Sequence, residues 1–141
     1  MFRRILVPTD GSEPALKAAR LAAVMAREAG AEVILLTAVT VPQSLVMVAG
    51  IGDDVVGEYI ENVGRDALEA AEAVFREAGV GVETKVVVGA ASEVIVEQAR
   101  VLGADVVVMG KRGLGELHGI LVGSVSDRVA HRLPIPLLLV P

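Results

Sequence analysis

Short apolar runs separated by helix-length segments limit the fold of this sequence more than any other feature. The runs cover residues 4–8, 32–41, 82–88, 104–109 and 135–140. Apolar runs of this length, bounded by Gly and Pro, are typical of strands that are buried on both faces of a parallel sheet. The aliphatic composition agrees, because aromatic residues make up only 2% of the chain and the core must therefore be built from Val, Leu, Ile and Ala.

The segments between these runs carry helix signals. Ser12 offers an N-cap before the first helix, Gly30 is a C-terminal stop, and Ser92 can cap a later helix. Apolar side chains recur at helical spacing in each segment. The predicted helices cover residues 12–30, 54–78, 92–102 and 124–133.

The alternation of strands and helices predicts one fold class. Repeated βα units with short links form right-handed crossovers and a parallel sheet with helices on both faces. A chain of 141 residues fits one such domain, and no linker or internal repeat divides it. We therefore expect a single doubly wound α/β domain over residues 1–141, with its ligand at the carboxyl ends of the strands.

Composition and charge exclude several classes of protein. The chain has no cysteine, which excludes disulfides and thiolate metal sites. Its net charge of −5 argues against nucleic acid as the main partner. Since no apolar window reaches about 18 residues, we expect no membrane span and a cytoplasmic location. His118 and His131 are too isolated for a metal site.

One apolar segment, residues 42–57, does not follow the pattern. A loop that packs its own side chains over the sheet edge is one interpretation. A partner surface or a mobile lid over a ligand is the other. The sequence alone leaves both open.

Glycines mark the region that carries chemistry. A buried strand ends at Gly110, Gly113 follows, and Gly123 stands directly before Ser124 at the start of a predicted helix. Glycine lets backbone N–H groups approach an anion, and a helix N-terminus favours phosphate. A glycine-rich surface loop without a ligand is the alternative. The spacing fits neither a Walker A loop nor a dinucleotide fingerprint.

Polar side chains in the same stretch add donors and positive charge. Ser124 and Ser126 supply hydroxyl groups, while Lys111 and Arg112 form a cationic pair in an acidic chain. Ser124 together with Asp127 also fits a capping box at the start of the helix. These groups favour a phosphate-bearing ligand.

The spacing Gly110-x2-Gly113-x9-Gly123-Ser124 resembles the ATP-binding motif of universal stress proteins. The opening residues 5–12 and the ending 134–140 are similar to that family as well, so the resemblance runs from end to end. It implies a flavodoxin-like sheet with strand order 3-2-1-4-5. It also implies the branch of the family that binds ATP. We further expect ATP to carry Mg²⁺ or Mn²⁺ bound through its phosphates.

The same resemblance assigns roles to individual residues. Asp10 would contact the nucleoside, the backbone of Ala38 or Val39 would meet the adenine, and Arg112 would lie beside the phosphates. Lys111 departs from the family, in which Thr or Ser is common, and is left out of the set. The full set is Pro8, Thr9, Asp10, Ala38, Val39, Met109, Gly110, Arg112, Gly113, Gly123, Ser124, Val125 and Ser126.

The last predicted strand suggests how two copies would associate. No charged residue occurs between Leu133 and Pro141, and the implied strand order puts this strand at a sheet edge. An open apolar edge is an aggregation hazard that pairing with a second copy removes. We expect a homodimer built on this strand, which the resemblance also implies.

The sequence favours a nucleotide-binding regulatory protein of the stress response, working with an unidentified protein partner, over a dedicated enzyme. A slow ATPase at the same site is one alternative, with Asp10 or Glu116 as the residues that would assist hydrolysis. A chaperone-like interaction protein that works through residues 42–57 is another.

Overall fold

The computed structural model describes residues 2–48, 53–111 and 123–141. These ranges contain five strands and five helices, with one helix between successive strands except for two between the second and third strands. In chain order the elements are β1 (Arg4–Pro8), α1 (Glu13–Ala29), β2 (Glu32–Val39), α2 (Gln43–Val48), α3 (Asp53–Glu77), β3 (Val82–Val88), α4 (Ala91–Val101), β4 (Val106–Gly110), α5 (Ser124–Arg132) and β5 (Leu137–Val140).

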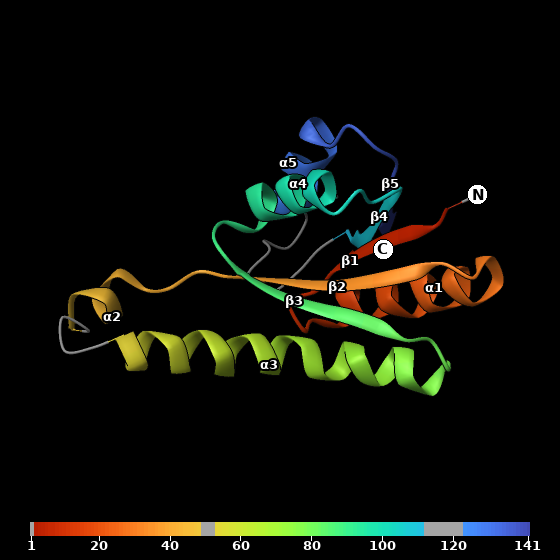
Figure 1. Ribbon diagram of the computed structural model, residues 1–141. Coiled ribbons are helices and arrows are strands. Elements are labelled where there is room, and N and C mark those ends of the chain that lie inside the picture. The colour runs from red at the N-terminus through yellow and green to blue at the C-terminus, as the bar shows by residue number, and fades with distance from the viewer. Residues whose placement is uncertain (1, 49–52, 112–122) are drawn as a thin grey trace.

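The strands form one sheet in the order β3-β2-β1-β4-β5, and every pair is parallel. This confirms the doubly wound α/β fold and the strand order implied by the family resemblance. Figure 1 shows the sheet between two helical layers, with α1 and α3 on one face and α4 and α5 on the other. Within the described residues, no helix is both long and apolar enough to cross a membrane.

Alternate strand residues supply the two cores. Ile5 and Val7 of β1 point to the α1 and α3 layer, where Phe75 is fully buried, while Leu6 between them points to the α4 and α5 layer. The buried side chains of helix α1 are all alanine, which lets the helix pack closely on the sheet. These buried residues are Ala15, Ala18, Ala19, Ala22, Ala23 and Ala26.

The predicted ends of α1 are confirmed. The Ser12 hydroxyl oxygen accepts a hydrogen bond from the Ala15 N–H at 3.4 Å, and Gly30 ends the helix with a left-handed φ of 66°. The predicted cap of α4 is wrong, because Ala90 is the N-cap and Ser92 is buried inside the helix.

Helices are present where residues 42–57 suggested an irregular loop, and that interpretation is wrong for the described part of the segment. The Pro42 carbonyl accepts hydrogen bonds from Leu45 and Val46, which starts α2, and α3 begins at Asp53. Residues 49–52 lie outside the described ranges. The six residues of α2 include no charged side chain, so their sequence offered little helical pattern.

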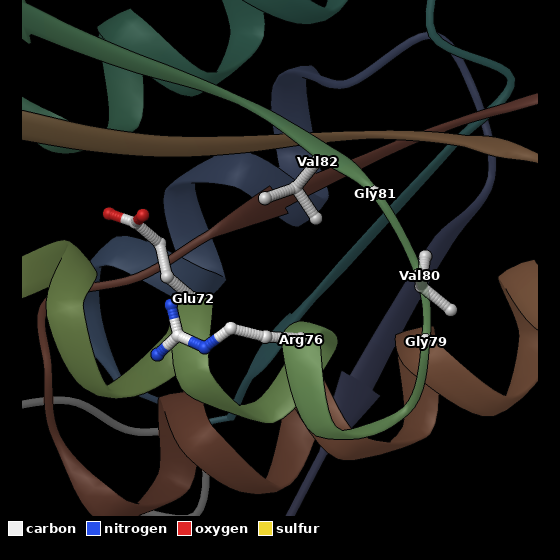
Figure 2. Close-up of a pocket in the computed structure, with 6 residues that line it drawn as sticks. All are labelled: Glu72, Arg76, Gly79, Val80, Gly81 and Val82. Atoms are coloured by element: carbon white, nitrogen blue, oxygen red, sulfur yellow. The ribbon is translucent and has the colours of Figure 1, made fainter.

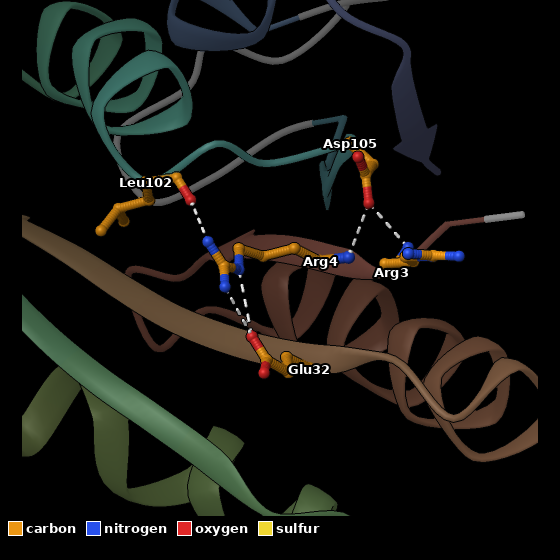
Figure 3. A network of polar contacts seen from close by, with 5 residues as sticks. All are labelled: Arg3, Arg4, Glu32, Leu102 and Asp105. Atoms are coloured by element: carbon orange, nitrogen blue, oxygen red, sulfur yellow. Dashed lines mark hydrogen bonds and ion pairs between the residues drawn. The ribbon is translucent and has the colours of Figure 1, made fainter.

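Side chains tie the strands together at the amino end of the sheet (Figure 3). The Asp105 carboxylate accepts hydrogen bonds from the backbone N–H groups of Arg3 and Arg4, at 2.7 and 2.8 Å. Arg4 in turn donates to the Glu32 carboxylate at 2.9 Å and to the Leu102 carbonyl at 2.7 Å. The two backbone donors, followed by the charges of Arg3 and Arg4, lower the pKa of Asp105 below 3.8.

Candidate functional site

The direction of chain crossover reverses between β1 and β4. From β1 the chain winds through β2 to β3 along one half of the sheet, and β4 and β5 extend the other half. Ligands of doubly wound folds bind at such a reversal, outside the carboxyl ends of the strands. The residues that follow β1 and β4 are therefore the first candidates for a site.

The turn after β1 is held by its own side chains. The Thr9 hydroxyl oxygen accepts from the Gly11 N–H at 3.1 Å, and one oxygen of Asp10 accepts from the Ser12 N–H at 2.9 Å. Gly11 takes a φ of 81°, which favours glycine. The Asp10 carboxylate is exposed to solvent and held at the edge of the sheet, while Thr9 is buried.

Strand β2 continues past the end of β1. The β1–β2 pairing stops at Pro8 and Leu36, whereas β2 stays paired with β3 as far as Val39 and Val88. The last residues of β2 therefore have a partner strand on one side only among the described strands.

Hydrogen bonds show which way these last residues face. The Leu36 carbonyl accepts from Thr9 at 2.8 Å on the β1 side, and the Val39 carbonyl accepts from Gly89 at 3.0 Å on the β3 side. Successive residues of a strand direct their backbone groups to opposite neighbours. Ala38 therefore directs its N–H and C=O toward the β1 side, beyond the point where β1 has ended.

The end of β4 lies against the start of α1. A Cβ atom on Gly110 would lie 2.8 Å from the Pro14 carbonyl carbon and 2.9 Å from its oxygen, and real Cβ atoms essentially never come so close to backbone atoms. Gly110 is therefore required by packing, a reason that the motif did not reveal. Met109 is buried in the core below α4 and α5.

Three hydrogen bonds join the start of α5 to the end of β4. The Lys111 carbonyl accepts from the Gly123 N–H at 2.9 Å. The buried Ser126 hydroxyl donates to the carbonyls of Gly110 and Lys111, at 3.0 and 2.9 Å. The hydroxyl donor that the sequence offered to phosphate is therefore used within the protein. Sequence reasoning missed this role, because it depends on which way the side chain points.

The N-terminus of α5 begins one residue earlier than the capping-box prediction requires. Gly123 is the N-cap, and the first helical hydrogen bond runs from Asp127 to the Gly123 carbonyl at 2.8 Å. The Ser124–Asp127 capping box is therefore wrong. The backbone N–H groups of Ser124, Val125 and Ser126 point along the helix axis toward the carboxyl edge of the sheet, as in the first turn of any helix.

Three predicted parts of the site lie at the carboxyl ends of parallel strands. The turn at Thr9 and Asp10 follows β1, Ala38 lies near the end of β2, and α5 begins beside the end of β4. Arg112 and Gly113 lie outside the described residues. This edge offers an exposed carboxylate, outward backbone groups and the positive end of a helix dipole. These groups can bind a base, a sugar hydroxyl and an anion.

A surface pocket of about 360 Å³ lies elsewhere, at the amino end of β3. Figure 2 shows Glu72 and Arg76 of α3 on one side and residues 79–82 on the other. It is far along α3 from the carboxyl edge and has no group of the predicted set. Among the described residues, no group of three or more His, Cys, Asp or Glu side chains is arranged to hold a metal ion.

Comparison with known proteins finds, across the whole chain, the same family that the glycine spacing resembles. The universal stress protein family model matches residues 1–141. Universal stress protein MJ0531 of Methanocaldococcus jannaschii is 34% identical over 140 residues, which cover 99% of this chain and 82% of that protein.

Two solved structures are also similar. Hypothetical protein MJ0577 superposes with a TM-score of 0.84 at 30% identity, covering 99% of this chain and 96% of the other. A universal stress protein in complex with cAMP superposes with a TM-score of 0.69 at 32% identity, covering 99% and 97%. With the family model and these relatives matched over nearly its full length, the chain belongs to the universal stress protein family.

Proposed function

We propose that this protein binds ATP at the carboxyl edge of the sheet and acts as a nucleotide-dependent regulatory factor of the stress response. The observation that carries the proposal is the convergence of three different binding groups on one edge. These are the Asp10 carboxylate, the backbone of Ala38 and the first turn of α5. The cAMP complex of the relative that is 32% identical supports an adenine nucleotide as the ligand class.

The base would bind at the end of β2. The N–H and C=O of Ala38 are one donor and one acceptor side by side, which complements the amidine-like edge of adenine. Val39 directs its backbone toward β3, and its carbonyl accepts from Gly89. We therefore assign base recognition to Ala38 rather than to Val39. Asp10 would accept a hydrogen bond from a ribose hydroxyl, with Pro8 and Thr9 lining the nucleoside.

The phosphates would lie at the first turn of α5. The helix dipole and the N–H groups of Ser124, Val125 and Ser126 favour negative charge there. Gly123 and Gly113 would let the backbone approach closely, and Arg112 would supply charge. Mg²⁺ or Mn²⁺, held through the phosphates, would neutralise the remaining charge. Met109 and Gly110 act below this site, by packing β4 against its neighbours.

We propose binding without dedicated catalysis. Hydrolysis needs a group that positions the attacking water. One oxygen of the Asp10 carboxylate accepts from the Ser12 N–H, and Glu116 lies outside the described residues. ATP would instead bias a conformation or an assembly that a partner in the cytoplasm recognises. Measuring turnover of the purified protein with Mg²⁺ or Mn²⁺ separates this proposal from a slow ATPase.

Nucleotide affinity of matched variants tests the site. At ATP concentrations of about 100 times Kd, binding adds about 2.7 kcal/mol to the free energy of unfolding. We expect Gly123→Val to abolish this stabilisation, because its side chain would fill the phosphate position. Asp10→Ala should weaken ATP far more than inorganic triphosphate, whereas Ser124→Ala should weaken both. Calorimetry that finds ATP affinity within about twofold of wild type in Asp10→Ala removes Asp10 from the site.

We also propose a homodimer that pairs β5 with its copy. Pro136 and Val140 direct their carbonyls toward β4, where these accept from Val107 and Lys111 at 3.0 and 2.8 Å. By alternation, Leu137 and Leu139 direct their backbone groups to the open edge. The strand begins at Leu137, two residues later than the sequence predicted, because the chain bends at residues 134–135.

A proline substitution at the open edge tests the dimer. Leu139→Pro removes a donor from the open edge, whereas Leu138→Pro removes one from the internal ladder with β4. We expect light scattering to report a dimer for wild type and a folded monomer for Leu139→Pro. A wild-type monomer at micromolar concentration would contradict the proposal.

A further inference from the structure

The open edge of β3 takes no part in the proposed nucleotide site. Strand β3 is the last strand on one side of the sheet, and all seven of its residues pair with β2. The Gly89 N–H donates to the Val39 carbonyl of β2, so the odd-numbered residues of β3 direct their backbone groups to β2. The even-numbered residues direct their N–H and C=O groups to the open edge, where no described residue bonds to them. A further strand could pair with this edge.

Apolar side chains are exposed along the same edge. Although Gly64 of α3 lies on Val86, this valine is still 39% exposed, and Val88 is 52% exposed. Residues 82–88 contain no proline that would prevent pairing. A strand of this length with exposed apolar side chains favours pairing with another strand, unless its charges oppose that strand. The order of the charges therefore decides which strand can pair.

The charges of β3 suit a second copy of the same strand. Glu83 and Lys85 flank Thr84 and lie on the α4 side of the sheet, since Val82 and Val87 pack on the α3 and α4 sides respectively. If two copies of β3 pair antiparallel with Thr84 on the two-fold axis, Glu83 of each copy lies opposite Lys85 of the other. Moving this register by two residues puts Glu83 opposite Glu83, or Lys85 opposite Lys85, which is repulsive. Charge therefore selects one register.

Helix α3 carries alternating charges on the side that adjoins the β3 edge. Glu72 and Arg76 extend from α3 beside residues 79–82, at the start of β3 (Figure 2). Glu61 and Arg65 stand 11 positions before them, which is about three helical turns, and so lie on the same side of the helix. Along this side of α3 the charges are negative, positive, negative and positive. A row of this order is complementary to its own reverse.

Contacts between α3 and β3 show which helix residues are level with Thr84. Gly64 lies on Val86, because a Cβ added there would be 2.8 Å from the Val86 side chain. The helix runs opposite to the strand, and two strand residues span about 6.6 Å, or between four and five helix residues. Thr84 is therefore level with about residues 68–69 of α3, midway between Gly64 and the pocket that Glu72 lines.

We propose that β3 pairs antiparallel with β3 of a second copy, around a two-fold axis at Thr84. The axis brings Glu61 level with Arg76 of the second copy, because these two residues are equally far from the level of Thr84. Arg65 comes level with Glu72 of the second copy for the same reason. Opposite charges then face each other on the strands and on the helices in one arrangement.

The contact would cover apolar surface and still be weak. Val86 of one copy would lie opposite Val82 of the other, beside the pocket of about 360 Å³. Ion pairs between exposed side chains contribute little, so we expect association at about 0.1–1 mM protein rather than at micromolar concentration. The contact lies at the opposite edge of the sheet from β5, and it depends neither on the β5 dimer nor on nucleotide binding. Together with that dimer, it would join dimers into larger assemblies.

Single cysteines test the pairing directly, because the chain has no cysteine of its own. Thr84→Cys puts two thiols at the axis, where hydrogen-bonded residues have Cα atoms about 5.5 Å apart, within reach of a disulfide. Val88→Cys is the matched control on the same edge, since its two copies would be about 27 Å apart. With oxidised glutathione, we expect Thr84→Cys to form a crosslinked dimer about tenfold faster than Val88→Cys on a non-reducing gel.

Charge variants of Thr84→Cys test the register. Lys85→Glu puts glutamates opposite each other and should slow the crosslink about tenfold. The exchange Glu83→Lys/Lys85→Glu restores opposite charges and should recover the rate of Thr84→Cys. Neither position is in the core, so circular dichroism should show that these variants are folded. The crosslink should also persist in Leu139→Pro, because that substitution lies at the other edge of the sheet.

Four results would overturn the proposal. Equal crosslinking of Thr84→Cys and Val88→Cys would show random collision. A rate that Lys85→Glu leaves unchanged would show that charge does not set the register. Loss of the crosslink in Leu139→Pro would assign it to assemblies built on β5. No crosslink up to about 1 mM protein would leave this edge to an extended segment of another protein.

Discussion

Polar groups at the two ends of the sheet point in different directions: those at the amino end bond to each other, and those at the carboxyl end face outward. At the amino end, the Asp105 carboxylate accepts from two backbone N–H groups, and Arg4 is shared between Glu32 and the Leu102 carbonyl (Figure 3). Donors and acceptors of the chain meet each other there. At the carboxyl end, Ala38 and the first turn of α5 direct backbone groups outward from the strands.

This difference teaches where to look for function in a fold of this kind. A polar network whose members complement each other stabilises the strand ends and leaves little for a ligand to bind. An end where strands stop unevenly, and where a helix begins, keeps backbone groups directed outward. Contacts within the carboxyl end, such as the close approach of Gly110 to Pro14 and the hydrogen bonds of the Ser126 hydroxyl, hold that geometry in place.

Among these substitutions, Gly110→Ala should lower the free energy of unfolding most. Its new Cβ meets the Pro14 backbone, which cannot move as a side chain would, so we expect a loss of about 1–3 kcal/mol in unfolding free energy. ATP affinity should fall as well, because α1 and β4 flank the site. Gly57→Ala, in α3 with no atom near its Cβ, is the control and should be stabilising by up to about 1 kcal/mol. Similar urea midpoints for the two variants would contradict the packing argument.

Ser126→Ala should have a smaller effect. It leaves the carbonyls of Gly110 and Lys111 without their hydroxyl donor, which should cost about 1–2 kcal/mol in urea unfolding. Ser124, which lies two residues earlier and is exposed, is the matched control. Ser124→Ala should lower nucleotide affinity and change stability less. A larger loss of stability in Ser124→Ala than in Ser126→Ala would contradict this assignment of roles.

The smallest effect is expected for Asp105→Asn, at the amino end of the sheet. Since the pKa of Asp105 is lowered in the folded protein, its stabilising contribution is complete above the unfolded value of 3.8. It is lost as pH falls through the lower folded pKa. Asp105→Asn should make unfolding free energy less dependent on pH below about 4 and leave ATP affinity unchanged. An altered ATP affinity in Asp105→Asn would contradict the expectation that the amino end of the sheet takes no part in nucleotide binding.

Much of the fold could be predicted from the sequence, because its signals are local. The run at residues 82–88 is apolar at most positions and became β3 without change, and Ser12 and Gly30 bound α1 as their chemistry requires. Helix α2 could not be predicted, since six residues without charge show no clear helical period. Ser92 failed as a cap because the chain turns helical one residue before it.

The candidate site was less predictable, because it depends on how side chains and backbone groups are oriented in the fold. A sequence contains Gly110 but not the Pro14 backbone that lies against it. It contains the Ser126 hydroxyl but does not show the two carbonyls that accept its hydrogen bonds. It could not choose between Ala38 and Val39 either, since that choice depends on where β1 stops beside β2.

Chemical-shift mapping by NMR tests the central claim most directly. On titration of the labelled protein with ATP and Mg²⁺, the amide signals of Asp10, Ala38 and residues 124–126 should shift together with one saturating affinity. The amides of Arg3 and Arg4, bonded to Asp105 at the other end of the sheet, should not move. No shift at millimolar ATP, or shifts centred on the amino end or on Glu72 and Arg76, would contradict the account.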